Sequence, residues 1–92
     1  MTQRNYLTQA DIEATVRRAD YHLFPGTTTT VCCLVLANGF TVIGESACAD
    51  PANFDAEIGR QYAFKDALGK VWRLEGYLLK ERLNAAETHA AA

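Results

Sequence analysis

The most reactive side chains in this sequence are three thiols, at Cys32, Cys33 and Cys48. None of them has CxxC spacing, and adjacent strand residues point to opposite faces, so Cys32 and Cys33 cannot easily bridge each other. A nucleophilic Cys48 would need an assisting base, and the sequence places no histidine to supply one. We expect free thiols that pack as small apolar side chains, with no metal site and no cofactor.

A row of hydroxyls in "GTTTT" is the second candidate for chemistry. Thr27 and Thr28 run toward a predicted helix start at Asp50, where free backbone N–H groups could hold a phosphate. Asp50 itself would oppose such an anion. The row is also a reasonable polar entry to a strand, because threonine is β-branched. A pocket for a small nucleotide is therefore one alternative here.

Charged and aromatic residues gather in "RRADYH" at the expected end of a first helix. Tyrosine stacking beside arginine charge suits a nucleotide or phosphate ligand, although an ordinary solvated helix end is favoured. A second polar set joins Glu45 to Arg60, with Asp55 and Glu57 as local alternatives. A salt bridge that fixes helix on hairpin is favoured over a polar cluster at a partner surface. Trp72 is expected in the core or as an interface anchor.

The candidate binding residues are Arg17, Arg18, Tyr21, His22, Thr27, Thr28, Glu45, Ser46, Asn53, Asp55, Arg60 and Trp72.

Several function classes are disfavoured by what the sequence lacks. It shows no P-loop, no GxGxxG, no Ser-His-Asp order and no paired catalytic carboxylates, so we expect no enzyme and no catalytic residue. A net charge of −2 argues against broad nucleic-acid binding. No apolar stretch approaches the ~20 residues of a membrane span, and the first residues lack a signal peptide's apolar core. We therefore expect a cytoplasmic protein.

The first element is predicted to be a helix that begins at a Thr8 cap. Asp11 stands where a carboxylate can complete a capping box. Ile12, Val16, Ala19 and Leu23 recur at helical spacing and make one apolar stripe. The break "FPG" at 24–26 ends this helix.

The second element is predicted to be a two-stranded antiparallel hairpin around Asn38-Gly39. That dipeptide favours a two-residue type I′ turn, which would place Val35 opposite Val42 and Cys33 opposite Gly44. Both faces of the ribbon are then largely apolar. We expect a homodimer in which a second copy covers the other face or extends the sheet, rather than helices of one chain wrapping both sides.

The third element is predicted to be a long C-terminal helix that Asp50 caps and Pro51 begins. Small residues from Ala56 to Ala67 let it lie close to the hairpin, and Gly69 leaves open a bend or break. The 92 residues thus form one α+β domain, 1–92, with 1–6 and 85–92 expected to fray.

A pattern across the second half of the chain resembles the small tailed-phage and prophage proteins of the gene-product-49/66-like family. Its parts are Asn38-Gly39-Phe40, Gly44 to Cys48, Pro51, Asn53 to Asp55, Glu57 to Arg60, Trp72 and Gly76-Tyr77. The first helix is also in the expected place, so the resemblance covers nearly the whole chain. The compact "FPGTTTT" connection and the glycine at position 69 depart from the family pattern.

The resemblance implies a phage accessory protein that acts in the host bacterial cytoplasm. By analogy, it implies a non-enzymatic inhibitor of a host protein, such as a defence component, in the manner of an anti-CRISPR protein. A sponge for a small nucleotide immune signal is the alternative. A helper in virion or replication assembly is a third.

Overall fold

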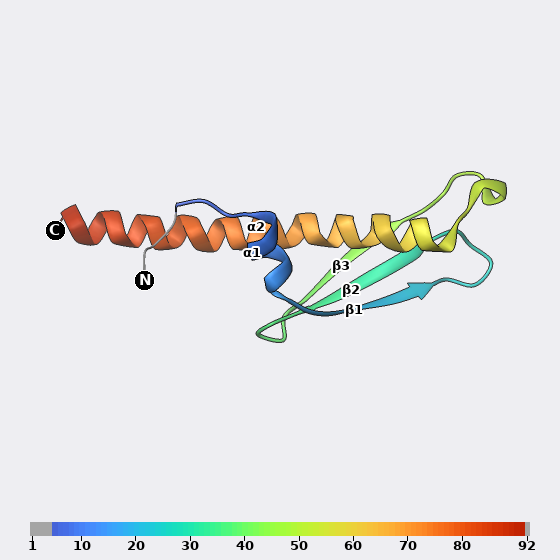
Figure 1. Ribbon diagram of the computed structural model, residues 1–92, viewed down its shortest axis with the longest axis horizontal. Helices are drawn as coiled ribbons and strands as arrows, with labels where there is room; N and C mark the ends of the chain where they lie inside the picture. The colour runs from blue at the N-terminus through green and yellow to red at the C-terminus, as the bar shows by residue number, and fades with distance from the viewer. Residues whose placement is uncertain (1–4, 92) are drawn as a thin grey trace.

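The computed structural model, which describes residues 5–91, is a three-stranded antiparallel sheet with one long helix across one face (Figure 1). The α+β class is confirmed, whereas the two-stranded hairpin is wrong because a third strand joins it. The elements are α1 (Gln9–Ala14), β1 (Val16–Leu23), β2 (Thr30–Leu36), β3 (Thr41–Ser46), the 3-10 helix η1 (Pro51–Asn53) and α2 (Ala56–Ala91). The strand order is β1-β2-β3. Of the ends expected to fray, residues 1–4 and 92 lie outside the described part.

The first helix has the predicted start and a much earlier end. The Asp11 N–H donates to Thr8 Oγ1 at 3.2 Å, and the Thr8 N–H donates to Asp11 Oδ2 at 2.9 Å, which completes the capping box. The helix ends at Ala14, and Val16 to Leu23 form a strand instead of continuing it. The predicted helix through Leu23 is therefore wrong, because pairing with β2 along the whole segment outweighs the local spacing of its apolar residues.

The turn between β2 and β3 has three residues, 37–39, and not two. Gly39 has a φ of 89°, but Asn38 does not have the positive φ that a type I′ turn requires. The Gly39 N–H donates to Leu36 O at 2.9 Å, and the Leu36 N–H donates to Phe40 O at 2.8 Å. The predicted register is therefore wrong by one residue, and Leu34 stands opposite Val42.

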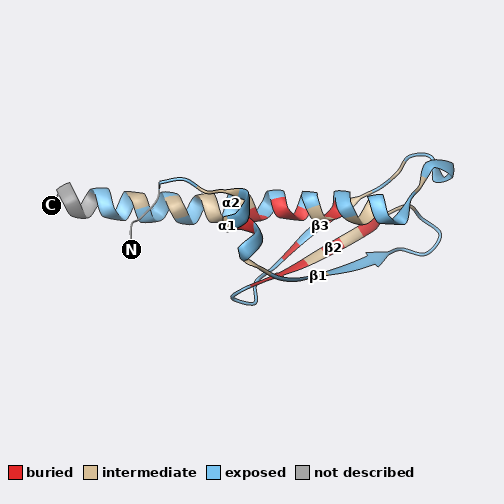
Figure 2. Ribbon diagram, in the orientation of Figure 1, coloured by how far each residue is buried: buried red, intermediate tan, exposed pale blue. Residues whose placement is uncertain are grey.

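The core lies between α2 and one face of the sheet, with α1 closing one end (Figure 2). This inner face carries Cys32 and Leu34 of β2 and Val42 of β3, all buried. The buried residues of this cluster are Ile12, Cys32, Leu34, Leu36, Val42, Ala63, Ala67, Leu68 and Val71. A single chain thus buries one face of its sheet.

The opposite face of the sheet is here called the open face, and no helix within residues 5–91 lies over it (Figure 1). Partners in the ladders share a face, and alternate residues lie on opposite faces. The open face consists of Arg18, Asp20 and His22 from β1, Val31, Cys33 and Val35 from β2, and Thr41, Ile43 and Glu45 from β3. The structure holds one chain, so the expected dimer stays a prediction.

Helix α2 approaches the sheet through its small residues, as expected for Gly59, Ala63 and Ala67. Ala63 and Ala67 are fully buried, whereas Ala56 is exposed. The helix runs through Gly69 without interruption for 36 residues, so no break occurs there. Its C-terminal half extends beyond the sheet (Figure 1).

Asp50 and Pro51 begin a separate short helix and not α2. The Asp50 carboxylate accepts from the Ala52 N–H at 3.0 Å, and Pro51 occupies the first position of η1. Helix α2 begins afterwards at Ala56, with Asp55 before it. The predicted cap and proline are confirmed, but for η1 alone.

Candidate functional site

A groove of about 520 Å³ lies between β1, α1 and α2. It forms because α2 lies chiefly over β3 and β2, so the inner side of β1 projects beyond the helix. Its lining residues are Gln9, Glu13, Tyr21, Glu57, Arg60, Gln61, Phe64, Lys65 and Leu68. The volume falls within the range of small-molecule sites. Both charge signs line the groove, so its charge selects no single ligand class.

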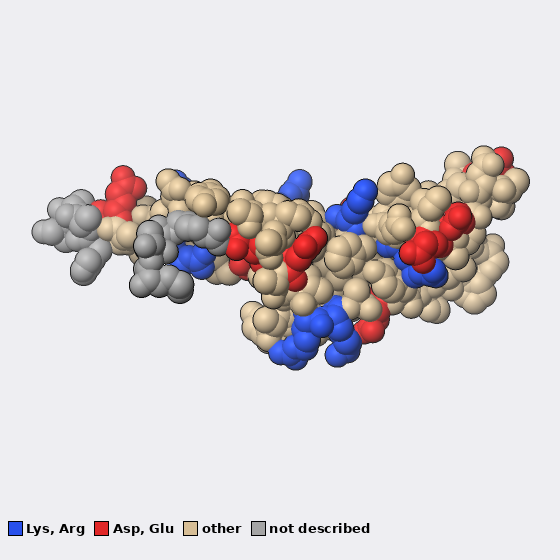
Figure 3. Space-filling view, viewed as in Figure 1, with Lys and Arg blue, Asp and Glu red and all other residues tan. Residues whose placement is uncertain are grey.

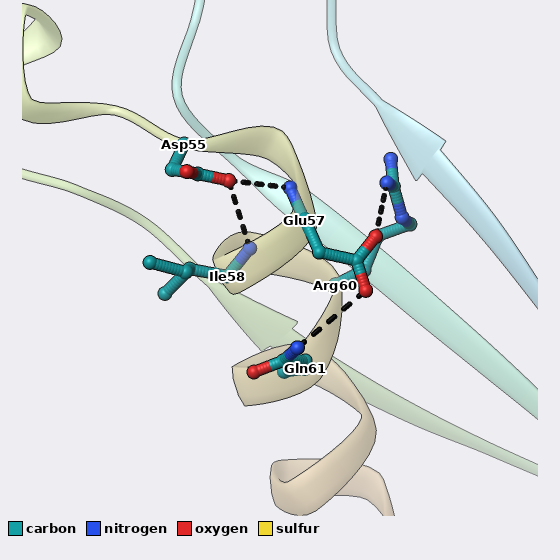
Figure 4. Close-up of polar contacts among 5 residues, drawn as sticks. All are labelled: Asp55, Glu57, Ile58, Arg60 and Gln61. Carbon is teal, nitrogen blue, oxygen red and sulfur yellow. Dashed lines mark hydrogen bonds and ion pairs between the residues drawn. The ribbon is translucent and has the colours of Figure 1, made fainter.

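A compact polar set lies at the α2 side of this groove (Figure 4). Arg60 Nη2 donates to Glu57 Oε2 at 2.6 Å, and Gln61 Nε2 reaches Glu57 Oε1 at 3.5 Å. These bonds, the Arg60 bond first, lower the pKa of the Glu57 carboxyl. On the opposite wall, burial raises the pKa of Tyr21, with a smaller contribution from Cys32 beside it. Both shifts favour the ionised carboxylate and the neutral phenol, the forms that these groups ordinarily have near pH 7.

A second hollow of about 200 Å³ brings together four predicted site residues, Thr28, Ser46, Asn53 and Asp55. Two of their hydroxyls already have partners within the chain. Thr28 Oγ1 donates to Cys48 O at 2.6 Å and accepts from the Cys48 N–H at 3.1 Å. Ser46 Oγ donates to Gly59 O at 2.6 Å. These hydroxyls hold the chain together around the hollow.

The start of α2 at this second hollow carries a negative charge (Figure 4). Asp55 Oδ1 accepts from the Glu57 N–H at 2.9 Å and from the Ile58 N–H at 3.2 Å. A carboxylate that caps a helix takes up the N–H groups that would otherwise hold an anion. The hollow is therefore poorly suited to a phosphate.

Strand β1 carries Arg17, Arg18, Tyr21 and His22, so their predicted place at the end of a helix is wrong, while their role in binding stays a prediction. Tyr21 faces the groove, whereas Arg18 and His22 belong to the open face. Arg17 lies at an irregularity of β1 and donates to Ala37 O. The ring of His22 meets that of Phe24 edge-on, with centroids 4.6 Å apart.

The predicted pair of Glu45 with Arg60 is also wrong. Glu45 lies on the open face, away from α2, and its backbone N–H donates to Asp66 Oδ2 at 2.9 Å. Arg60 pairs with Glu57, which was one of the local alternatives. The one-residue shift in register places Glu45 opposite Val31, on the face that α2 does not cover.

Two predicted binding residues contribute to structure. Thr27 Oγ1 donates to Phe24 O at 2.8 Å within the loop between β1 and β2. Trp72 is partly buried against the core cluster. Sequence reasoning missed Phe64, Lys65 and Leu68 as groove residues, because it placed Tyr21 on a helix and so gave the groove no second wall.

The three cysteines are free thiols. Burial raises the pKa of the Cys32 thiol, which disfavours the reactive thiolate. Cys48 Sγ lies 3.2 Å from Asp50 O as a donor. Within the described residues, no group of three or more His, Cys, Asp or Glu side chains is arranged to hold a metal ion.

The open face has an apolar centre and a charged border. Ile43 is 46% exposed there, beside the partly buried Val31 and Cys33. Arg18, Asp20, His22 and Glu45 surround them. Arg18 Nε and Asp20 Oδ2 are 3.0 Å apart and both side chains are exposed. The face is thus a ready interaction surface with charges of both signs.

Comparison with known proteins gives one match. A family described as "Phage protein (N4 Gp49/phage Sf6 gene 66) family" matches residues 7–83, which span α1, the sheet and most of α2. No curated protein and no solved structure matches the chain significantly. Within the described residues, no helix has the length and apolar character needed to cross a membrane.

Proposed function

Because this chain belongs to the Phage protein (N4 Gp49/phage Sf6 gene 66) family, we propose that it is a non-enzymatic accessory protein that binds and inhibits a host protein. The target that we propose is a component of bacterial anti-phage defence, which the protein would bind in the host cytoplasm. Membership supports the phage setting of this proposal. The surface chemistry supports binding of a protein.

The observation that carries the proposal is the open face. A sheet face with valine, cysteine and isoleucine at its centre is ordinarily covered. Here Ile43 is 46% exposed, and no helix or strand of the described part of the chain lies over it. A protein surface with an apolar centre and charged border of its own would cover these residues and pair with border charges such as Glu45.

The proposal that the protein is not an enzyme rests on how its reactive groups are used. Cys32 is buried, and the Cys48 thiol donates to the backbone carbonyl of Asp50. Glu57 is held in an exposed ion pair with Arg60. None of these contacts joins a nucleophile to a base.

The test is capture of the target from phage-infected cells that carry defence systems. Ile43→Lys places a charge at the centre of the open face. Leu78→Lys is the matched control, at an exposed position in the C-terminal half of α2. We expect wild type and Leu78→Lys to capture the same host protein, with at least tenfold less captured by Ile43→Lys. Equal capture by both lysine variants would overturn the use of the open face.

Two other functions would give different results in experiments with the same protein. A sponge for a nucleotide signal would show a saturable rise in melting temperature with cyclic or ADP-ribose-type nucleotides. The carboxylate of Asp55 in the second hollow disfavours this reading. A helper in virion or replication assembly would capture a phage-encoded protein instead of a host protein.

We further propose that the protein acts as a homodimer. A domain of 92 residues buries a limited core, and association with a second copy would add to the buried surface. The two edges of the sheet indicate where the two copies would meet.

A further inference from the structure

The two edges of the sheet are treated differently by the rest of the chain. At the β3 edge, the Glu45 N–H donates to Asp66 Oδ2 at 2.9 Å, and Lys70 Nζ donates to Ile43 O at 2.7 Å. Asp66 and Lys70 are one helical turn apart on α2. Their side chains thus occupy backbone groups that a further strand would need.

These two bonds also fix which backbone groups of β1 point outward. Residues of a strand direct their N–H and C=O groups alternately to its two sides. Since the Glu45 N–H and the Ile43 C=O point away from β2, the N–H and C=O groups of Val42 and Gly44 point toward β2 and bond to it. Continuing the alternation through the ladders, Cys33 bonds to Asp20 of β1.

It follows that Ala19, Tyr21 and Leu23 direct their N–H and C=O groups to the free edge of β1. No hydrogen bond among residues 5–91 uses these backbone groups. In Figure 1, β1 is the strand farthest from α2. In Figure 3, basic and acidic side chains lie together over this side of the molecule. The β3 edge thus has two of its outward backbone groups occupied by side chains of α2, whereas the β1 edge is open to pairing.

We propose that β1 pairs in antiparallel fashion with β1 of a second copy, which joins two three-stranded sheets into one of six strands. The two-fold axis passes at Ala19, so Arg18 stands opposite Asp20 of the second copy on each side of the axis. This assembly does not rest on the proposed host target. It uses the edge of the sheet together with Arg18 and Asp20 at the border of the open face. It leaves available the centre of that face, which Val31, Cys33 and Ile43 form.

The order of charged residues along β1, with Arg18 and Asp20 on either side of Ala19, favours a second copy of β1 as the pairing partner. Opposite charges directly across a strand pair stabilise it, and like charges destabilise it. With Ala19 on the axis, both cross-strand pairs join arginine to aspartate. With Asp20 on the axis, two carboxylates would face each other. An isologous pair satisfies every contact twice.

The first experiment measures the mass of the purified full chain by light scattering at micromolar concentration. We expect a mass near twice the chain's 10.1 kDa. Ala19→Pro should give the single-chain mass with an unchanged circular dichroism spectrum, because the N–H that proline removes makes no bond within the chain. Ile43→Lys, on the open face, should keep the doubled mass.

The second experiment uses charge reversal and covers the case in which Ala19→Pro does not fold. Arg18→Asp and Asp20→Arg each place like charges across the axis, so each should give the single-chain mass. The double variant restores opposite charges and should recover the doubled mass. The exposed Arg18–Asp20 contact within one chain contributes little to folding, so all three variants should fold.

A crosslink fixes the register. In a Cys33→Ser/Cys48→Ser background, Ala19→Cys should form an intermolecular disulfide under mild oxidation, because hydrogen-bonded antiparallel partners have Cα atoms ~5.5 Å apart. Leu23→Cys should not form one. A single-chain mass for wild type, doubled mass for both single charge reversals, or dissociation by Ile43→Lys would each overturn the proposal.

Discussion

Gly44 of β3 lies directly against the backbone of Ala67 in α2. A Cβ placed on Gly44 would stand 2.2 Å from Ala67 N and 2.3 Å from Ala63 O, far inside contact distance. The absence of a side chain at position 44 is what allows α2 to settle on the sheet. The contact also ties β3 and α2 into one packing unit, since Ala63 and Ala67 are fully buried.

We therefore expect Gly44→Ala to lower the free energy of unfolding by about 3 kcal/mol, because the atoms in its way are backbone and cannot rotate aside. Gly69→Ala is the matched control, since its Cβ meets nothing within 4 Å. It should raise the free energy by about 1 kcal/mol through helix propensity. Urea unfolding followed by circular dichroism measures both. Equal stability of Gly44→Ala and wild type would contradict the close contact.

The cap of α2 gives a second expectation. Asp55→Ala removes the acceptor for the Glu57 and Ile58 N–H groups and should lower the free energy of unfolding by about 1 kcal/mol. Asp55→Asn keeps an acceptor and should retain most of that stability. Asp50→Ala affects only the three-residue η1 and should cost less. Thermal melts of the three variants rank them.

The thiols should differ sharply in reactivity. Cys33 and Cys48 are partly exposed, whereas Cys32 is fully buried, with its thiol pKa raised by burial. Titration of the native protein with Ellman's reagent should therefore show two fast thiols, and a third only after unfolding. Cys32→Ala should keep both fast reactions. Three fast thiols in wild type would show that the core opens more readily than its packing implies.

The Glu57–Arg60 pair should account for part of the loss of folding stability at acidic pH. Arg60 lowers the pKa of Glu57 from its ordinary 4.5, so the folded state favours the ionised carboxylate. The resulting stabilisation is complete above pH 4.5 and is lost as the pH falls through the lower folded-state pKa. Glu57→Gln should flatten the fall of the urea midpoint from about pH 5 to about pH 3. Arg60→Gln removes the cause and should flatten it similarly, while a steeper fall in either variant would contradict this role.

The sequence was informative where local chemistry decides the structure. The capping box of Thr8 with Asp11, the cap at Asp50 and the small stripe on α2 all depend on neighbours within a turn or two. It failed at β1, where Val16, Ala19 and Leu23 have helical spacing. An edge strand with most of its residues exposed shows little alternation, so only its pairing with β2 reveals it.

The site was predicted less well, because it depends on the register. Asn38-Gly39 indicated a hairpin correctly, but the loop includes Ala37 and the pairing moves by one residue. Both faces of the ribbon were apolar, so the sequence pattern could not detect the shift. Glu45 consequently stands on the open face. The groove beside Tyr21 depends on β1 being a strand, which no local sequence pattern predicted.

The bonds from Asp66 and Lys70 to β3 have a consequence for how large an assembly can become. A sheet with two free edges can grow without limit, because each added copy offers a new edge. A sheet with one free edge is exhausted by a single addition. In the proposed assembly, two side chains one turn apart on α2 would thus limit association to two copies and guard the chain against polymerisation.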